Sequence, residues 1–426
     1  MVCRPYPSAA RRAAPHFALV LILLASLRAS AAAPVHRSCS PARIPARSGR
    51  LVPERPRTPG GLQGVFFNPQ LRPDPDFPWL LHYPVCREGV LSALRELTAT
   101  RRINFIAVFV IIPNTLRVPA QGNRPGETLE QWANTGFLDN VARFVDDCHE
   151  SGLKVEIDLV DNRWIPYAVD SAAHIGAPGK PWWPVADAEP WRASAEWYRQ
   201  VIVTVEAHAR HPEAIAFWCM MGNYHWGAAE PVLWDDAGRP DIRRYTEMFV
   251  KSVWPIFRAA GRRPKAAPIM LPIFAQNDYW RSRTPTERLA GFVNLKHWIV
   301  DDLKSPPDFW VMSTYPYCDP APDGFHYLRA IVEILGHANA GRIISTDLKG
   351  EGHESEVRDT LLDLAHRSGA EALRWHLAKC KEYGFAGWWM WAYQDTPSSL
   401  SGLRRRDGTW KEELLAEIPE TKQPAK

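Results

Sequence analysis

The stretch AIAFWCMMGNYHW, Ala214 to Trp226, joins an apolar run of strand length to a polar and aromatic end. The run closes on Gly222 and Asn223, where a loop is expected to begin. In a barrel of parallel strands, the carboxyl ends of the strands and the loops after them carry the chemistry. We therefore expect Asn223, Tyr224, His225 and Trp226 to face a substrate, although a buried strand followed by a plain turn also fits this stretch.

Strand-like and helix-like segments alternate along the chain on both sides of this stretch. The other expected strands are Gly64–Phe67, Asn104–Ile112, Lys154–Val160, Ala267–Ile273, Phe309–Ser313, Arg342–Thr346 and Gly387–Trp391. The expected helices are Glu88–Thr100, Phe137–Glu150, Glu189–Ala209, Asp241–Ala260, Leu289–Leu303, Tyr327–Ala338, Glu371–Tyr383 and Lys411–Ile418. Asn104–Ile112 is continuously apolar, which is typical of a parallel strand buried on both faces. With no Gly-rich phosphate fingerprint after any strand, the pattern predicts an α/β fold, a single-domain (β/α)8 TIM barrel.

The N-terminal segment reads as a targeting signal. Three arginines, Arg4, Arg11 and Arg12, precede the short apolar run Phe17–Leu27, and small residues follow it. Residues 1–33 are therefore predicted to be a signal peptide of a secreted or periplasmic protein. Residues 34–59 are rich in Pro, Arg and Ser and predict a disordered linker, because such a composition buries too little apolar area. Residues 60–426 would form the barrel, and no later apolar stretch approaches transmembrane length.

Charge and cysteine usage narrow the classes of partner. The formal net charge is +4, and without the four Arg of the signal peptide and the six Arg and one Glu of the linker about −5 remains. A mildly acidic globular part argues against a nucleic-acid partner. The 7 cysteines show no CxxC or Cys/His spacing, so we predict no metal site, no cofactor and buried free thiols, although export would permit a disulfide.

Polar and aromatic residues gather after the predicted strands. Those singled out as substrate contacts are Asp161, Trp164, Asn223, Trp226, Tyr315, Tyr317, Trp391 and Asp395. Carboxylates serve as acids and bases at a glycosidic bond, amides bind hydroxyl groups, and flat rings stack on sugar faces. The chain has 19 Trp, and the loop pair Trp182 and Trp183 is hard to explain as core. A carbohydrate is therefore the expected partner.

On these residues the chain resembles the cellulase-like, retaining (β/α)8 glycoside hydrolases, from about Gly64 to Ile418. The segments that carry the likeness are Gly152–Asp158, Phe217–Asn223, Ser313–Tyr317, Ile344–Asp347 and Gly387–Trp391, in the family's order. The resemblance implies hydrolysis of O-glycosyl bonds, with Asp347 as nucleophile or base. It also implies Asn223 as the contact to the hydroxyl beside the reacting carbon, Tyr317 as the residue that orients Asp347, and Trp391 as the subsite floor.

The departures from this family fall on its catalytic positions. Tyr224 stands where the acid/base Glu is expected, Asp347 replaces the nucleophile Glu, Ala107 replaces an Arg and Tyr315 replaces a His. A second carboxylate is needed because glycosidases use a pair. The candidates are Glu351, Asp158, Asp161, Asp395 and Glu230. Tyr224 as a nucleophile is a further option that would need a neighbouring base.

Two functions follow from this sequence. The first is an exported glycoside hydrolase acting on a polysaccharide or oligosaccharide, with Asp347, Tyr224 and Glu351 as its candidate catalytic residues. The alternative is a carbohydrate-binding barrel that keeps aromatic subsites and has lost hydrolysis, which the missing Glu after Asn223 favours. A metal-dependent hydrolase is not supported, because the sequence has no HxH or HExxH spacing.

Overall fold

The computed structural model describes residues 61–71, 79–112, 136–161, 189–220, 240–269, 290–313, 326–348, 369–396 and 400–421. For some residues at the ends of helices and strands, the structure describes the backbone but not the side chain. All these residues belong to one unit of the chain, Arg57–Lys426. The predicted signal peptide (1–33) and linker (34–59) lie outside the described residues.

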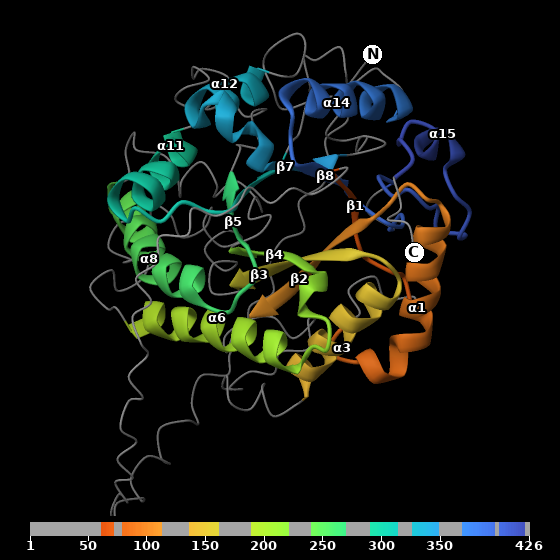
Figure 1. Ribbon diagram of the computed structural model, residues 1–426, viewed down its shortest axis with the longest axis horizontal. Coiled ribbons are helices and arrows are strands. Elements are labelled where there is room, and N and C mark those ends of the chain that lie inside the picture. The colour runs from red at the N-terminus through yellow and green to blue at the C-terminus, as the bar shows by residue number, and fades with distance from the viewer. Residues whose placement is uncertain are drawn as a thin grey trace, which may run out of the picture. The chain divides into compact units, whose positions relative to one another are not determined.

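Eight parallel strands close into a barrel in sequence order, β1 to β8, and β8 pairs with β1. The strands are β1 (Leu62–Phe66), β2 (Phe105–Ile112), β3 (Lys154–Asp161), β4 (Ile215–Met220), β5 (Lys265–Ile269), β6 (Phe309–Ser313), β7 (Ile343–Leu348) and β8 (Gly387–Met390). Because every strand runs the same way, all eight carboxyl ends meet at one end of the barrel. This confirms the predicted (β/α)8 fold (Figure 1).

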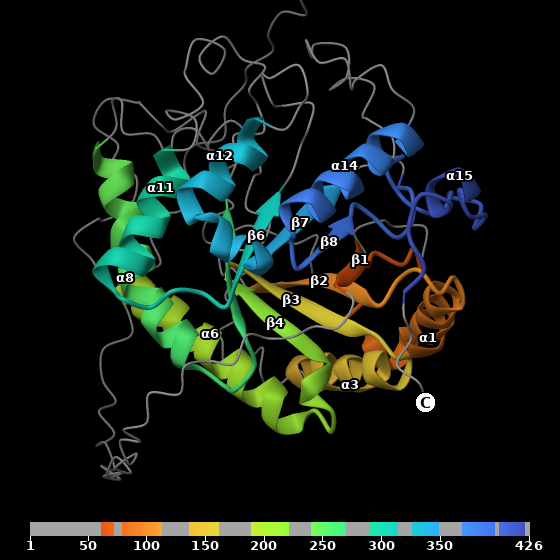
Figure 2. The same ribbon diagram turned by 45° about the horizontal axis from the view of Figure 1, so that its top comes forward.

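Helices connect the strands and surround them (Figures 1 and 2). They are α1 (Tyr83–Ala99), α3 (Phe137–Glu150), α6 (Glu189–His208), α8 (Pro240–Ala259), α11 (Ala290–Lys296), α12 (His326–Leu335), α14 (Gly369–Tyr383) and α15 (Glu412–Leu415). Short turns of other helix types are η2 (Pro212–Ala214), η3 (His297–Asp302) and η5 (His337–Arg342). The packing of the helices against the barrel follows from their apolar faces. In helix α3, the apolar residues Phe137, Val141, Phe144 and Val145 recur at helical spacing and are all buried.

Several boundaries differ from those expected from the sequence. Helix α1 begins at Tyr83 rather than at Glu88, because Pro84 suits a first helical turn and Tyr83 is buried. Strand β5 begins at Lys265, whose backbone N–H donates to Asp308 Oδ2 at 2.8 Å. The sequence did not predict this start, because a charged residue is not typical of a buried strand. The Lys265 side chain is nevertheless buried, and its burial lowers its pKa to about 8.

The core has two layers, one between strands and helices and one inside the barrel. The inner layer is built from side chains of seven strands: Leu62, Phe105, Ala107, Phe217, Cys219, Ala266, Phe309, Val311, Ile344 and Trp389. Large and small residues complement one another across this space. A Cβ atom at Gly64 would lie 2.5 Å from Phe105 Cδ1 and 2.8 Å from the Phe105 carbonyl oxygen. Glycine is therefore required opposite this ring, and the barrel interior is a packed core.

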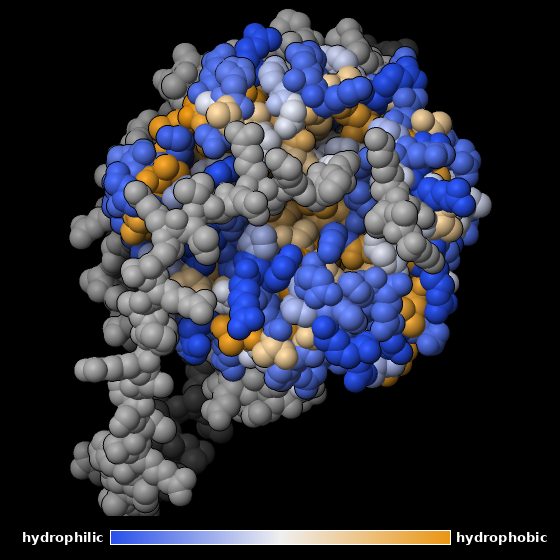
Figure 3. Space-filling model, in the orientation of Figure 1, coloured by the Kyte–Doolittle hydropathy of each residue, from blue (hydrophilic) through white to orange (hydrophobic). Residues whose placement is uncertain are grey.

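On the face seen in Figure 3, the described residues are mostly polar, with apolar patches between charged side chains. Among the described residues, the exposed large apolar side chains are Val85, Val203, Ile256, Val293 and Leu400. They are scattered over different elements, which is normal for a protein surface. Among the helices that the structure describes, none combines the length and apolar character that crossing a membrane requires.

Candidate functional site

An aromatic group lies toward the carboxyl ends of β1, β2 and β8, which we call the aromatic platform: Phe66, Phe109 and Trp391. The rings of Phe66 and Trp391 stack, with centroids 4.4 Å apart and planes at 10°. Phe109 lies 4.4 Å from Phe66 and 6.1 Å from Trp391, tilted to both. All three side chains are partly exposed. Flat apolar surface at this end of a barrel suits the face of a sugar ring.

The platform rests on a fully buried layer. Trp389 precedes Trp391 by two residues on β8 and points into the same interior, and it is completely buried. Its ring centroid lies 6.1 Å from that of Phe66. The step from Trp389 to Trp391 therefore marks where the packed interior gives way to the partly exposed mouth. The predicted role of Trp391 as a subsite floor is consistent with this position.

Acidic side chains lie inside the barrel below the mouth. Glu156 and Asp158 on β3 and Cys219 on β4 are fully buried, and one ligand-type atom from each lies within 4.8 Å of the others. Trp389 donates its indole N–H to Glu156 Oε2 at 2.8 Å. Burial raises the pKa of the Cys219 thiol well above its usual value, and Asp158 and Glu156 raise it further. The raised pKa keeps the Cys219 thiol protonated in this packed interior.

Sequence reasoning identified Asp158 but not Glu156. Asp158 lies within β3, as it does within the expected strand Lys154–Val160, and β3 continues to Asp161. The two acidic residues stand two positions apart in an otherwise apolar strand, and period-two alternation puts both on one face. That spacing was the signal in the sequence that the acidic pair faces the barrel interior.

Strand β7 carries an irregularity at the predicted catalytic position. Ser345 pairs with Trp388 and Leu348 pairs with Met390, so two residues of β7, Thr346 and Asp347, stand against one residue of β8. Such a bulge shifts the alternation of side chains, and bulges are common beside active sites. The structure describes only the backbone of Asp347, and the bulge lies at that residue.

Most other predicted site residues lie outside the described part of the chain. These are Tyr224, Glu351, Asn223, Trp164, Trp226, Tyr315 and Tyr317, as well as Glu230. The structure describes the backbone of Asp161, which is the last residue of β3. The structure thus brings together Trp391, the bulge at Asp347 and the end of β3 at one end of a single barrel.

Asp395 lies after β8, and its carboxylate is engaged within the fold. Its Oδ1 accepts the backbone N–H of Gly402 at 2.8 Å and pairs with Lys411 Nζ at 3.2 Å. The side chains of Asp395 and Lys411 are only 4% and 2% exposed. The ion pair therefore holds the segment after β8 against the C-terminal segment. Tyr393 and Gln394, which precede Asp395, are buried as well.

A second polar cluster lies on the outer side of β7. Ser345 Oγ lies 3.2 Å from His376 Nε2 on α14, and both residues are buried. Burial lowers the pKa of His376 to about 3, so the imidazole is neutral near pH 7. Burial likewise raises the pKa of the nearby Cys380 thiol to about 12. These groups lie between strand and helix, and the thiols of Cys148, Cys219 and Cys380 are buried and form no disulfide, as predicted; Cys86 is buried as well.

Comparison with known proteins yields structural likeness alone. No family model matches the sequence, and no curated protein matches it. A GH5_18 variant from Bifidobacterium longum subsp. longum ATCC 55813, in complex with Manb1-4GlcNAc, matches with TM-score 0.50 and 13% identity, over 84% of this chain and 77% of that one. The exo-beta-1,4-mannosidase Op5Man5 from Opitutaceae bacterium strain TAV5 matches with TM-score 0.49 and 17% identity, over 84% and 58%. A GH5-4 endoglucanase from Clostridium acetobutylicum matches with TM-score 0.45 and 13% identity, over 76% and 88%.

The fold is therefore that of the (β/α)8 barrels found among glycoside hydrolases. This confirms the resemblance expected from the sequence at the level of the fold. At this identity the likeness concerns the arrangement of strands and helices. Activity and substrate have to be argued from this chain's own residues, because one fold supports many chemistries.

Proposed function

We propose that the protein is an exported glycoside hydrolase that cleaves O-glycosyl bonds of a polysaccharide or oligosaccharide. The observation that carries the proposal is the aromatic platform of Phe66, Phe109 and Trp391 at the carboxyl end of a glycoside-hydrolase-like barrel. Sugar rings present flat faces of C–H bonds that stack on such rings. Chemistry in these barrels takes place at the same end.

Asp347 is the proposed nucleophile or base. It stands at the bulge of β7, at the end of the barrel where the platform lies. Hydrolysis requires a second acidic group, roughly 5 to 5.5 Å from the first in a retaining enzyme or roughly 6.5 to 9.5 Å in an inverting one. Glu351, Glu230 and Asp161 at the end of β3 remain its candidates from the sequence, and Tyr224 remains an alternative nucleophile that would need a neighbouring base.

The remaining proposed contacts follow the chemistry of a sugar. Asn223 would bind the hydroxyl next to the reacting carbon, and Tyr317 would orient Asp347. Trp391 would support the ring of the sugar at the cleavage site. The other proposed contacts are Trp164, Trp226, Tyr315, Asp161 and Asp395. For Asp395 the buried pair with Lys411 supports a role in holding the mouth segment rather than a direct contact.

A carbohydrate-binding barrel without hydrolysis is the second candidate. The aromatic platform supports it equally, because stacking binds a sugar without chemistry. Tyr224 at the expected position of the acid/base also favours it. The two candidates differ in one measurable property, which is turnover.

The experiment is a screen of glycans and aryl glycosides with the wild type, Asp347→Ala and Asp347→Asn. We expect turnover by the wild type and a loss of at least about a hundredfold in kcat for both variants, as for loss of a general acid or base. The matched control is Asp301→Asn, an exposed carboxylate on η3. Turnover retained in Asp347→Ala would exclude this residue from the mechanism. Saccharide binding by the wild type with no turnover would establish the second candidate.

Export is tested separately. The basic and apolar residues before Ala33 support removal of a signal peptide. Mass spectrometry of the protein recovered from the periplasm or the medium should find a mature N-terminus between residues 31 and 34. An intact N-terminus in the cytoplasmic fraction would contradict the proposal.

A further inference from the structure

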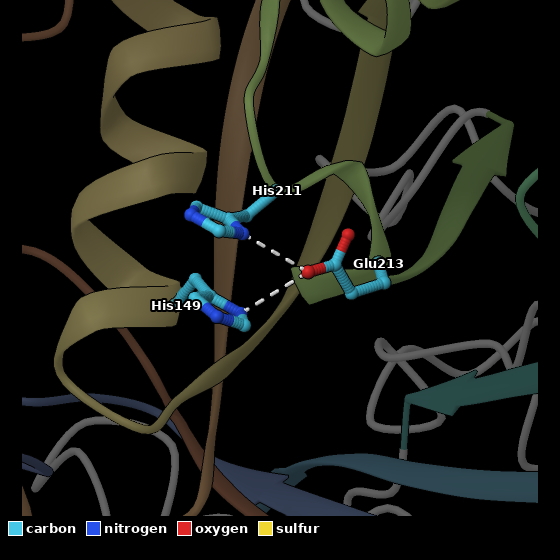
Figure 4. Close-up of side chains that lie close together, drawn as sticks. All are labelled: His149, His211 and Glu213. Atoms are coloured by element: carbon cyan, nitrogen blue, oxygen red, sulfur yellow. Dashed lines mark hydrogen bonds and ion pairs between the residues drawn. The ribbon is translucent and has the colours of Figure 1, made fainter.

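Two histidines and a glutamate meet at the end of the barrel opposite the platform. His149 lies in the last turn of α3, which leads into β3, and His211 and Glu213 lie in the turn that leads into β4. All three therefore precede the amino-terminal ends of their strands. Figure 4 shows both imidazole rings beside the carboxylate of Glu213. This cluster has no part in the function proposed above.

The nitrogen atoms of both histidines approach the same oxygen. His211 Nδ1 lies 3.1 Å from Glu213 Oε1, and His149 Nδ1 lies 3.6 Å from it. One ligand atom from each residue falls within 4.8 Å of the others. The two rings are stacked face to face, with centroids 3.9 Å apart and planes at 4°. Three atoms that bind metals thus converge from two separate segments of the chain.

The backbone under these side chains is well fixed. Asp146 Oδ1 accepts the backbone N–H of His211 at 2.8 Å, which ties the turn to α3. Lys154 Nζ donates to the Glu213 carbonyl oxygen at 2.9 Å, which ties the same turn to β3. Pro212 stands between the two ligands and restricts the backbone of the turn. Little ordering of the chain would therefore be needed to bring the ligands together.

We propose that His149, His211 and Glu213 form a binding site for a divalent transition metal of the Zn²⁺ class, with water as the fourth ligand. Bonds of about 2.0 to 2.2 Å in a tetrahedral site place neighbouring ligand atoms about 3.3 to 3.6 Å apart. The observed separations of 3.1 and 3.6 Å from Glu213 Oε1 are close to that range. Because the two rings are stacked in parallel, their lone pairs do not point at one position, so metal binding would require the rings to rotate out of the stack; their side chains are 40% and 35% exposed, which leaves room for this.

The donor set selects the kind of metal. Two imidazoles and one carboxylate suit Zn²⁺, Cu²⁺ or Ni²⁺, whereas Mg²⁺ and Ca²⁺ prefer sites built from oxygen alone. Arg210, which precedes His211, pairs with Asp146 at 3.2 Å and Glu150 at 2.8 Å. Its charge is thus balanced by carboxylates outside the cluster.

A metal here would join the end of α3 to the turn before β4. The amino-terminal end of a (β/α)8 barrel contributes to stability, whereas the carboxyl end carries the chemistry. The bound metal would raise the stability of the folded protein, because it binds the native state and not the unfolded chain. It would take no part in turnover.

The test titrates the full-length protein with Zn²⁺ by isothermal calorimetry and records the absorption spectrum with Co²⁺. We expect His149→Ala, His211→Ala and Glu213→Gln each to weaken Zn²⁺ binding at least about tenfold, since even loss of a second-shell partner costs 10- to 100-fold. The matched control is His297→Ala. His297 contacts Asp301 through Nδ1 at 3.2 Å and Asp302 through Nε2 at 3.4 Å. The two carboxylates therefore lie at opposite sides of the imidazole ring and do not converge on one position for a metal.

Thermal unfolding gives an independent readout. Saturating Zn²⁺ should raise the Tm of the wild type and of His297→Ala but not that of the three site variants. The Tm values without metal show whether each variant still folds. We expect all three variants to fold, because none of the three side chains is buried. Equal Zn²⁺ affinity in the wild type and the site variants, or an octahedral Co²⁺ spectrum in the wild type, would overturn the proposal. Turnover is not part of this test, so its outcome is independent of the proposed hydrolysis.

Discussion

Trp389 donates its indole N–H to Glu156 across the inside of the barrel, with 2.8 Å between Nε1 and Oε2. The two residues are 233 positions apart in the chain and both are fully buried. The bond joins β8 to β3 directly beneath the aromatic platform. It ties the floor of the mouth to an acidic group that is out of contact with solvent.

Trp389→Phe should lower the free energy of unfolding by about 1 to 3 kcal/mol. The substitution removes the donor from a buried carboxylate and leaves a small void. Urea denaturation monitored by circular dichroism measures the change. Trp389→Phe combined with Glu156→Gln should recover part of the loss, because the charge is removed together with its donor. A stability equal to the wild type in Trp389→Phe would show that this bond contributes nothing.

Trp391→Ala should weaken saccharide binding about tenfold, which corresponds to about 1.4 kcal/mol. The substitution removes the large ring that stacks on Phe66 at the mouth. Trp391→Phe keeps an aromatic face and should retain most of the affinity. Binding of oligosaccharides by calorimetry measures both variants. Unchanged affinity in Trp391→Ala would argue against the platform as a sugar site.

Asp395→Asn should destabilise the protein by about 3 to 5 kcal/mol. The buried partner Lys411 would then keep its charge without the carboxylate that it pairs with. Asp395→Asn together with Lys411→Met should recover much of the loss. The exposed pair of Lys379 and Glu382 serves as control, since its removal should cost at most about 1 kcal/mol.

The same substitution separates two roles of Asp395. If the residue holds the segment after β8, Asp395→Asn lowers the Tm but leaves KM unchanged under conditions where the variant is folded. A rise in KM without loss of stability would instead support a direct contact to the substrate.

The buried His376 should make stability depend on pH. Its folded pKa of about 3 lies below the ordinary value of about 6.5, so the unfolded chain binds more protons between these values. The stabilisation is full above about pH 6.5 and is lost as the pH falls toward 3, by up to about 1.4 kcal/mol per pH unit. His376→Leu should reduce the slope of the free energy of unfolding against pH by up to about 1.4 kcal/mol per pH unit, which corresponds to one proton. An exposed substitution, His208→Gln, is the control, and an identical slope in His376→Leu and the wild type would contradict the prediction.

The sequence alone determined the barrel and the order of its elements. Helix α3 and strand β6 have the bounds that periodicity predicted, because a repeating apolar pattern reflects which face of an element is buried. Trp391 could be placed at the mouth on the same basis, as the last residue of an apolar strand.

Only the tertiary structure decided which polar groups meet. Nothing local to Glu156 predicts that its partner is Trp389, and nothing local to Asp395 predicts Lys411. The bulge at Asp347 depends on the register between β7 and β8, and the cluster of His149, His211 and Glu213 depends on how α3 lies against the turn before β4. Periodicity is set by neighbours within one turn or strand, whereas register and side-chain pairing are set by contacts between segments far apart in the chain.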